Sequence, residues 1–465
     1  MSILFENAAV LVREKGPDGV YNVLNGAYLG VEGDRIDNIG FDRPDKKYDE
    51  TRDMTGKLLM PGLINAHGHS AMTLVRGAGS GLPLQRWLNE AIFPIEAKMT
   101  PEDISAGITW ACMEMLASGT TCVADMYDFP FAGALAFAKS GMKANLSRVG
   151  LCFDKELEPG DWPRTAECIN FINVLEGRAD INPEAIKELP GITRTMSLPA
   201  EIKEAVAAGR LKAEFCLHSE YLTTDRFVKA ISEANSVMHK SVHIHVSETE
   251  KEHKECIERH GVTPTEYFAE MGILDNPAYF AHCVWSTDKD LRIMTKKCAT
   301  LVHNPSSNLK LGSGFARIPE AVSAGVNVAL GTDGAASNNN LNMFEEMHLA
   351  SLLSKGKYQN PTLITDTQVL DMATINGAKA LGRPDTGCLR RGSKADIIAV
   401  DTDAPHMLPA LDLVALLVSS AQAADVCMTM ADGRILYENG RFLTIDAKKA
   451  KEDLLKSVER LGLQA

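Results

Sequence analysis

The residues best suited to chemistry are histidines and acids that end short apolar segments. His67 and His69 flank a single glycine at the end of such a run. In an extended strand, residues two apart point the same way, so both imidazoles can face one point. Neutral imidazoles are common ligands of divalent transition metals. Alone the pair is weak evidence, because many such pairs are ordinary surface or core histidines.

Further polar side chains end other apolar segments. His218, His245 and His282 each end one, and Asp333 ends the last. If these segments are parallel strands of one barrel, their carboxyl ends share a rim where catalytic groups collect. Titratable groups at so many strand ends are difficult to explain as packing. The alternative is that each is a satisfied polar residue in a loop.

Three nearby residues are candidates for supporting roles. Glu248 lies just beyond the segment that ends in His245, where an acid can act as a proton shuttle, the alternative being a solvated loop residue. His243 shares a face with His245 but lies deeper, so we expect a structural role inside the barrel. For His303 we expect a structural or supporting role.

Apolar, strand-like segments alternate with helical patterns through the middle of the chain. This alternation predicts a TIM (β/α)8 barrel, whose strands are buried on both faces and are therefore nearly continuously apolar. The expected strands are 58–67, 121–127, 145–153, 212–218, 242–246, 279–282, 300–303 and 326–333, with helices such as 101–117, 224–234 and 264–271 between them. The long crossover, about 154–210, must hold extra helices.

Short β-type segments at both chain ends flank this middle region, such as 27–31 and 396–400. We therefore expect an α/β protein with a small β-sandwich domain built from both chain ends. The predicted β-sandwich covers residues 1–57 and 385–465. The metal-dependent barrel covers 58–384, with an insertion at about 177–208.

Composition narrows the classes of partner. The 465 residues carry a formal net charge of −13, which repels phosphate, so we expect no nucleic-acid and no membrane partner. The ten cysteines form no CxxC pair. We therefore expect reduced thiols. The sequence has no apolar run of about 18 residues and no signal-like start. Together these features predict a cytoplasmic protein.

Several motifs resemble those of the amidohydrolase superfamily. They are Pro-Gly-Leu-Ile-Asn-Ala-His-Gly-His at 61–69, His-Val-Ser-Glu-Thr at 245–249, Ala-His-Cys at 281–283, Val-His-Asn-Pro-Ser-Ser-Asn at 302–308 and Gly-Thr-Asp-Gly-Ala-Ala-Ser-Asn at 331–338. The chain is most similar to the 5-methylthioadenosine/S-adenosylhomocysteine deaminases and related adenosine deaminases and chlorohydrolases. The likeness covers nearly the whole chain.

The resemblance implies one divalent metal per chain, usually zinc, with iron as the alternative. The implied ligands are His67, His69, His245 and Asp333. No lysine ends the fourth strand-like segment, where binuclear members place a carboxylated one, so a single metal is expected.

The resemblance also implies a set of substrate contacts. Glu96 would bind a ribose diol and Trp87 would lie against the base or ribose, although the first could be a helix-end charge and the second a core residue. Arg148, His218 and Glu248 complete the expected substrate-binding set. At 218–221 the chain reads His-Ser-Glu-Tyr where the family commonly has His-Ala-Pro-Tyr.

The implied reaction is hydrolytic deamination of an adenosine-type purine nucleoside: methylthioadenosine, S-adenosylhomocysteine, 5′-deoxyadenosine or adenosine. A bound cation lowers the pKa of water from about 16 towards 7. Asp333 would take the water proton, Glu248 would protonate the ring nitrogen, and His282 would stabilise the developing oxyanion before ammonia leaves.

We also expect a homo-oligomer. Two alternative functions stay open. The same site could act on another heterocycle, as a guanine, pterin or cytosine deaminase or as a chlorohydrolase. Glu96 argues against this, because a diol partner is useless to a bare base. The chain could also be a non-catalytic scaffold with the amidohydrolase fold, which would not need the complete set of site residues.

Overall fold

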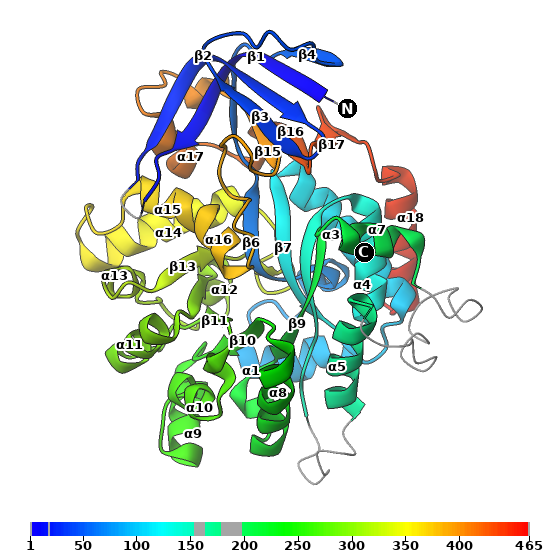
Figure 1. The fold of residues 1–465 in the computed structure, drawn as a ribbon. Helices are drawn as coiled ribbons and strands as arrows, with labels where there is room; N and C mark the ends of the chain where they lie inside the picture. Colours follow the sequence, from blue (N-terminus) through cyan, green and yellow to red (C-terminus); the bar gives the residue numbers. More distant parts are fainter. Residues whose placement is uncertain (1, 17–18, 153–162, 178–197, 464–465) are drawn as a thin grey trace. The chain divides into compact units, whose positions relative to one another are not determined.

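The computed structural model describes residues 2–16, 19–152, 163–177 and 198–463 (Figure 1). The chain divides into two compact units. The first comprises Met1–Asn65, Met113–Cys122 and Asn342–Asp446, and the second comprises Ala66–Cys112, Val123–Leu341 and Ala447–Ala465. The domain boundaries predicted at 57/58 and 384/385 stay a prediction.

The first unit contains a sheet whose strands come from both chain ends. Its path is β18 (Arg441–Phe442), β17 (Arg434–Glu438), β16 (Val426–Ala431), β15 (Ile397–Asp401), β5 (Lys57–Pro61), β1 (Ser2–Arg13), β2 (Tyr21–Glu32) and β3 (Arg35–Gly40), and β4 (Glu50–Asp53) pairs with β1. Figure 1 shows β1 to β3 beside β15 to β17. Phe5 and Leu29 share one apolar core with Ile397 and Met430. This confirms the β domain predicted from both ends.

The second sheet forms the barrel. Its order is β13 (Asn327–Leu330), β12 (Thr300–His303), β11 (Ala278–His282), β10 (Val242–Val246), β9 (Leu211–Leu217), β8 (Lys143–Arg148), β7 (Thr120–Tyr127), β6 (Leu63–His69) and β14 (Asp333–Gly334). β13 pairs with β12, and β14, which begins shortly after β13 ends, pairs with β6. The eighth strand is therefore in two pieces that close the sheet, as a TIM barrel requires.

Three predicted strands differ from the structure, and one of them is the eighth, which the sequence predicts as a single strand over 326–333 but which is divided into β13 and β14. The segment 58–67 is not one strand, because it divides at Gly62 into β5, in the terminal sheet, and β6, in the barrel. Gly62 belongs to neither strand, and its N–H donates to the Asp396 carbonyl. The third strand ends at Arg148 rather than 153, and residue 153 lies outside the described residues.

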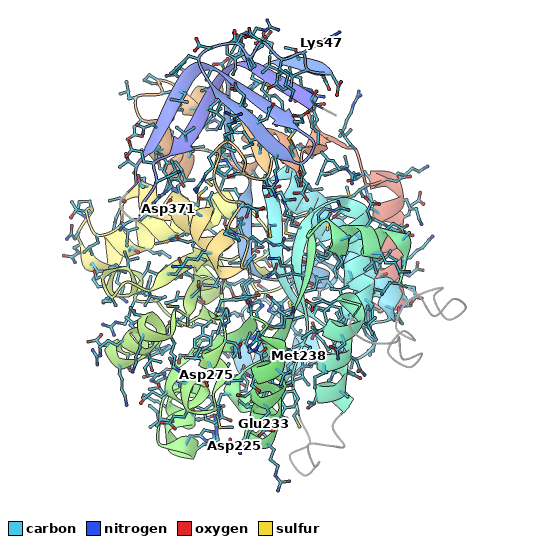
Figure 2. All side chains as sticks on the ribbon, viewed as in Figure 1. Lys47, Asp225, Glu233, Met238, Asp275 and Asp371 are labelled. Atoms are coloured by element: carbon cyan, nitrogen blue, oxygen red, sulfur yellow. The ribbon has the colours of Figure 1, made fainter. Side chains whose placement is uncertain are left out.

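The barrel helices begin where local chemistry predicts. α3 (Pro101–Ala117) confirms the predicted helix, whereas α8 (Asp225–Met238) extends past the predicted end. Thr224 caps α8 by accepting from the Phe227 N–H. Exposed acids such as Asp225 and Glu233 line its outer face (Figure 2). No helix within the described ranges is long and apolar enough to cross a membrane.

The connection between β8 and β9 contains extra helices, as expected. Within the described part of this connection they are α5 (Pro163–Leu175) and α7 (Ala200–Ala207). Of the insertion predicted at about 177–208, residues 178–197 lie outside the described residues.

Candidate metal centre and its cavity

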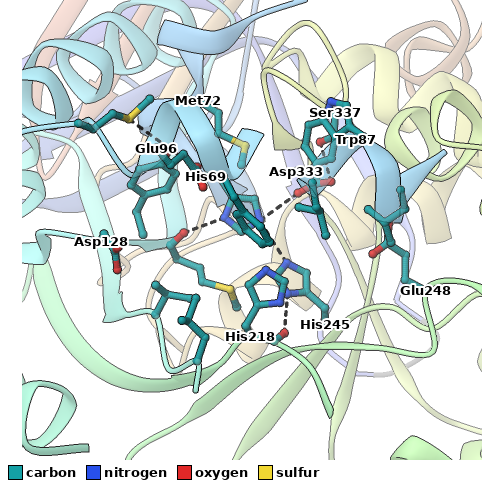
Figure 3. Close-up of a pocket in the computed structure, with 18 of the residues that line it drawn as sticks. His69, Met72, Trp87, Glu96, Asp128, His218, His245, Glu248, Asp333 and Ser337 are labelled. Atoms are coloured by element: carbon teal, nitrogen blue, oxygen red, sulfur yellow. Dashed lines mark hydrogen bonds and ion pairs between the residues drawn. The ribbon is translucent and has the colours of Figure 1, made fainter. Parts of the chain in front are cut away.

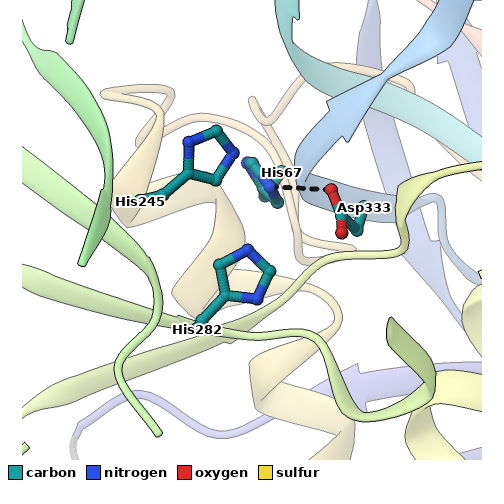
Figure 4. A group of neighbouring side chains, drawn as sticks. All are labelled: His67, His245, His282 and Asp333. Atoms are coloured by element: carbon teal, nitrogen blue, oxygen red, sulfur yellow. Dashed lines mark hydrogen bonds and ion pairs between the residues drawn. The ribbon is translucent and has the colours of Figure 1, made fainter. Parts of the chain in front are cut away.

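Histidines and an aspartate from four barrel strands meet at one point (Figure 4). Ligand atoms of His67, His245, His282 and Asp333 all lie within 4.8 Å of one another, and all four side chains are buried. The residues come from β6, β10, β11 and β14, so the strand ends do share a rim. This group of three histidines and one aspartate could hold a metal ion.

His69 lies at the same point. Its Nε2 is 3.1 Å from His245 Nε2 and 3.2 Å from Asp333 Oδ1. His67 Nε2 is 3.1 Å from the same carboxylate oxygen. The structure thus brings the predicted ligands His67, His69, His245 and Asp333 together, with His282 beside them. Which of the four histidines bind the metal stays a prediction.

Backbone carbonyls orient two of these imidazoles. His69 Nδ1 donates to the Met126 carbonyl at 2.7 Å, and His245 Nδ1 donates to the His218 carbonyl at 2.6 Å. A carbonyl only accepts, so each Nδ1 carries a proton and each Nε2 faces the centre. This arrangement is typical of metal-binding histidines and fits a divalent cation.

Side chains hold the other two imidazoles. His67 Nδ1 lies 2.7 Å from His243 Nε2, and His282 Nδ1 lies 2.8 Å from Asn308 Oδ1. His243 is fully buried, and its ring centre is 4.3 Å from that of Tyr279. His243 therefore lies inside the barrel, as expected, and contacts a predicted ligand.

Asp333 gives the centre a charge that suits a cation. Burial raises the pKa of Asp333, but hydrogen bonds with His67 and His69 outweigh it and hold the pKa well below its usual value. Burial lowers the pKa of His69, yet Asp333 more than offsets this and raises it to about 9. Ser307 and Ser337 both donate to Asp333 Oδ2, which leaves Oδ1 towards the imidazoles. A divalent cation would satisfy the carboxylate in place of the His69 proton.

A cavity of about 280 Å³ opens beside this cluster. Predicted residues on its walls are Trp87, Glu96, His218, Glu248 and His282, together with His69, His245 and Asp333. Figure 3 shows Glu96 on one side of the imidazoles and Glu248 on the other. His303, for which we expect a structural or supporting role, is buried, and burial lowers its pKa to about 3.

Glu248 lies beside the cluster and contacts His282. Its Oε2 is 3.9 Å from His282 Nε2, and Ser313 donates to its Oε1 at 3.5 Å. Burial raises the pKa of this carboxyl above its usual value. A raised pKa favours the protonated form of the carboxyl.

Glu96 and Trp87 lie in the helical segment 84–96. Glu96 ends α2 (Phe93–Glu96), and the Tyr127 hydroxyl donates to its Oε1. Burial of the carboxyl raises its pKa to about 7. Trp87 begins the helical turn Trp87–Ile92 and donates from Nε1 to the Ala78 carbonyl at 3.0 Å, which fixes the indole in the wall.

Arg148 is not among the residues that line the cavity. Its guanidinium pairs with Asp128 at 3.0 Å and with Glu167 at 2.7 Å. Asp128 does line the cavity, as does Arg164, which pairs with Asp128 at 2.8 Å. Neither Asp128 nor Arg164 is among the site residues predicted from the sequence. Asp128 directly follows β7, so the strand-end argument could have found it, whereas no pattern marks Arg164.

Comparisons with known proteins agree with this architecture. The amidohydrolase family model matches residues 58–436. A 5-methylthioadenosine/S-adenosylhomocysteine deaminase from Acetivibrio thermocellus is 40% identical, over 99% of this chain and 100% of that protein. A 5′-deoxyadenosine deaminase from Methanosarcina mazei is 39% identical, over 99% and 98%.

A solved structure shares the fold. The crystal structure of an adenosine deaminase from Xanthomonas campestris with bound zinc matches with a TM-score of 0.82 and 26% identity. The match covers 99% of this chain and 98% of that chain. The strand-end histidines, the barrel and the family match all agree. The chain therefore belongs to the amidohydrolase family.

Proposed function

We propose that this protein is a metal-dependent hydrolase that deaminates an adenosine-type purine nucleoside. The observation that carries the proposal is one cavity with two kinds of wall. The same cavity is lined by the predicted ligands His69, His245 and Asp333, by Glu248 and His282 beside them, and by Glu96 and Trp87. The names of the two relatives at 40% and 39% identity support the same substrate class.

His67, His69, His245 and Asp333 would hold one zinc ion, with iron as the alternative. Their Nε2 atoms and the Asp333 Oδ1 atom converge, and the opposite atoms of His69 and His245 already donate to carbonyls. Bound there, the metal supplies Lewis-acid polarisation and makes water nucleophilic near neutral pH.

The side chains around the cluster provide the proton transfers. Asp333 takes a proton from the attacking water. Glu248 gives a proton to the ring nitrogen next to the amino-bearing carbon, which makes that carbon electrophilic. His282, held at Nδ1 by Asn308, stabilises negative charge at the new oxygen when its Nε2 carries a proton. Asp333 then gives its proton to the amino group, which leaves as ammonia, and the new hydroxyl gives its proton to Glu248 to form the product carbonyl.

Glu96 provides the contact that distinguishes a nucleoside from a free base. An ionised carboxylate can accept from both ribose hydroxyls through charge-assisted hydrogen bonds, each worth about 1.5–3 kcal/mol. The indole of Trp87 offers a flat apolar surface to the base or sugar. A homo-oligomer and a cytoplasmic location stay predictions.

The test is ammonia release from a panel of purines. We expect methylthioadenosine, S-adenosylhomocysteine, 5′-deoxyadenosine or adenosine to be the best substrate. Adenine and 2′-deoxyadenosine should be poor, because each lacks all or part of the diol. A higher kcat/KM for adenine, guanine or a chlorotriazine would refute the nucleoside assignment.

A further inference from the structure

A second buried acid lies directly behind the loop that carries Glu248. Glu252, in the first turn of α9 (Glu250–His260), is only 2% exposed. One of its carboxylate oxygens accepts from the Ser247 N–H at 2.8 Å, and the other accepts from the Glu248 N–H at 2.7 Å. The carboxylate thus holds the backbone of the residue proposed to move the proton.

This loop has a conformation that needs support. Ser247 has a φ of 50°, in the left-handed region that residues with a side chain seldom adopt. Its hydroxyl lies 3.0 Å from His253 Nδ1, also in the first turn of α9. Two buried N–H groups and a strained residue are therefore tied to the helix by Glu252 and His253.

Helix capping alone does not explain why a buried acid stands at position 252. The N-cap of α9 is Thr249, whose hydroxyl already accepts from the Glu252 N–H. The 2.8 and 2.7 Å hydrogen bonds of the carboxylate go to Ser247 and Glu248, which precede the cap. Burial, and then the charge of Glu248, raise the pKa of Glu252 to about 8. A buried acid whose pKa is raised by burial and by the charge of a second acid destabilises the fold, which is unexpected for a residue that only starts a helix.

We propose that Glu252 is a positioning residue for Glu248: its carboxylate fixes the 247–248 backbone so that the Glu248 carboxyl stays over the cavity, beside His282. The proposal rests on the proposed function only in the proton-transfer role of Glu248. Glu252 itself is not among the residues that line the cavity.

A double-mutant cycle tests the coupling. Glu252→Ala should lower kcat by about 10²-fold, as expected when a reacting group is misplaced by about 1 Å, with KM and metal content within about twofold of the parent. In a Glu248→Gln background, the same change should lower kcat by less than about twofold, since the residue it positions no longer transfers a proton. Glu252→Gln, which keeps one acceptor oxygen, should fall between Glu252→Ala and the parent.

Glu250→Gln is the matched control. Glu250 lies in the same turn but is exposed, and it pairs with Lys254 on the surface. Its replacement should leave kcat unchanged. If Glu252→Ala lowers kcat equally in the parent and Glu248→Gln backgrounds, the positioning role is refuted.

Amide hydrogen exchange gives a readout that needs no substrate. Glu252→Ala and Glu252→Gln should both speed exchange in peptides that cover 247–248, whereas Glu250→Gln should not. Unchanged exchange in both Glu252 variants would overturn the proposal, even if the protein deaminates nucleosides. Faster exchange in a chain that deaminates no purine would support the backbone contact and refute the proposed function instead.

Discussion

The two walls of the cavity are built in different ways. On the metal side, His69 and His245 come from barrel strands, and backbone carbonyls set their orientation at 2.7 and 2.6 Å. On the proposed substrate side, Trp87 and Glu96 come from short helices, and Arg164, which also lines the cavity, comes from α5 in the long connection. Strand pairing positions the residues on the metal side, whereas local packing positions those on the proposed substrate side. Substitutions on the metal side should therefore abolish turnover. Substitutions on the proposed substrate side should change which substrate is preferred.

The largest expected effect concerns the metal side. Glu248→Gln should lower kcat by about 10²–10⁴-fold, because a neutral amide cannot shuttle the proton. Metal content by elemental analysis should match the parent, since Glu248 is not an expected ligand. Equal rates for variant and parent would remove Glu248 from the reaction.

A change to the substrate side should act on recognition instead. Glu96→Ala removes both proposed hydrogen bonds to the ribose and should lower kcat/KM for nucleosides by about a hundredfold or more. The small activity on adenine should change little, because adenine has no diol. A similar loss for adenine and nucleoside would show that Glu96 acts on the chemistry and not on the sugar.

Replacing His243, which contacts the predicted ligand His67, should weaken metal binding. His243→Leu removes the partner of His67 Nδ1 and should weaken metal binding by about 10–100-fold, as measured by competition with a chelator. His243→Gln, which can accept a hydrogen bond, should lose less. Parent-like affinity in His243→Leu would mean that packing alone orients His67.

The smallest expected effect is a pH dependence of substrate affinity. Burial raises the pKa of Glu96 to about 7, so the carboxylate that accepts from the ribose is present above that pH and is lost as the pH falls through it. KM for a nucleoside should rise about tenfold from about pH 8 to about pH 6. Glu96→Gln should abolish this dependence, and an unchanged slope in that variant would assign it to another group.

The two walls also differ in how far the sequence predicts them. His245, His282 and Asp333 could be found because parallel strands bring their carboxyl ends to one rim, so position in a segment predicts position in space. Arg148 also lies at a strand end, yet its guanidinium turns to Asp128 and Glu167. Side-chain pairing of this kind depends on the long 148–211 connection, whose course no sequence period specifies.

The division of 58–67 into two strands has a similar cause. An unbroken apolar run shows that the backbone is extended and buried, but not which sheet each half joins. Pairing of β5 with β15 and β1 takes the first half into the terminal sheet. Such long-range partners cannot be recognised within the run itself.

The most direct test of the account is ammonia release from methylthioadenosine by the purified chain before metal removal, after it, and after zinc is added back. The account predicts about one zinc or iron per chain in active protein, loss of ammonia release on chelation, and recovery with one equivalent of zinc. Protein that contains no metal and whose ammonia release is untouched by chelators would contradict it.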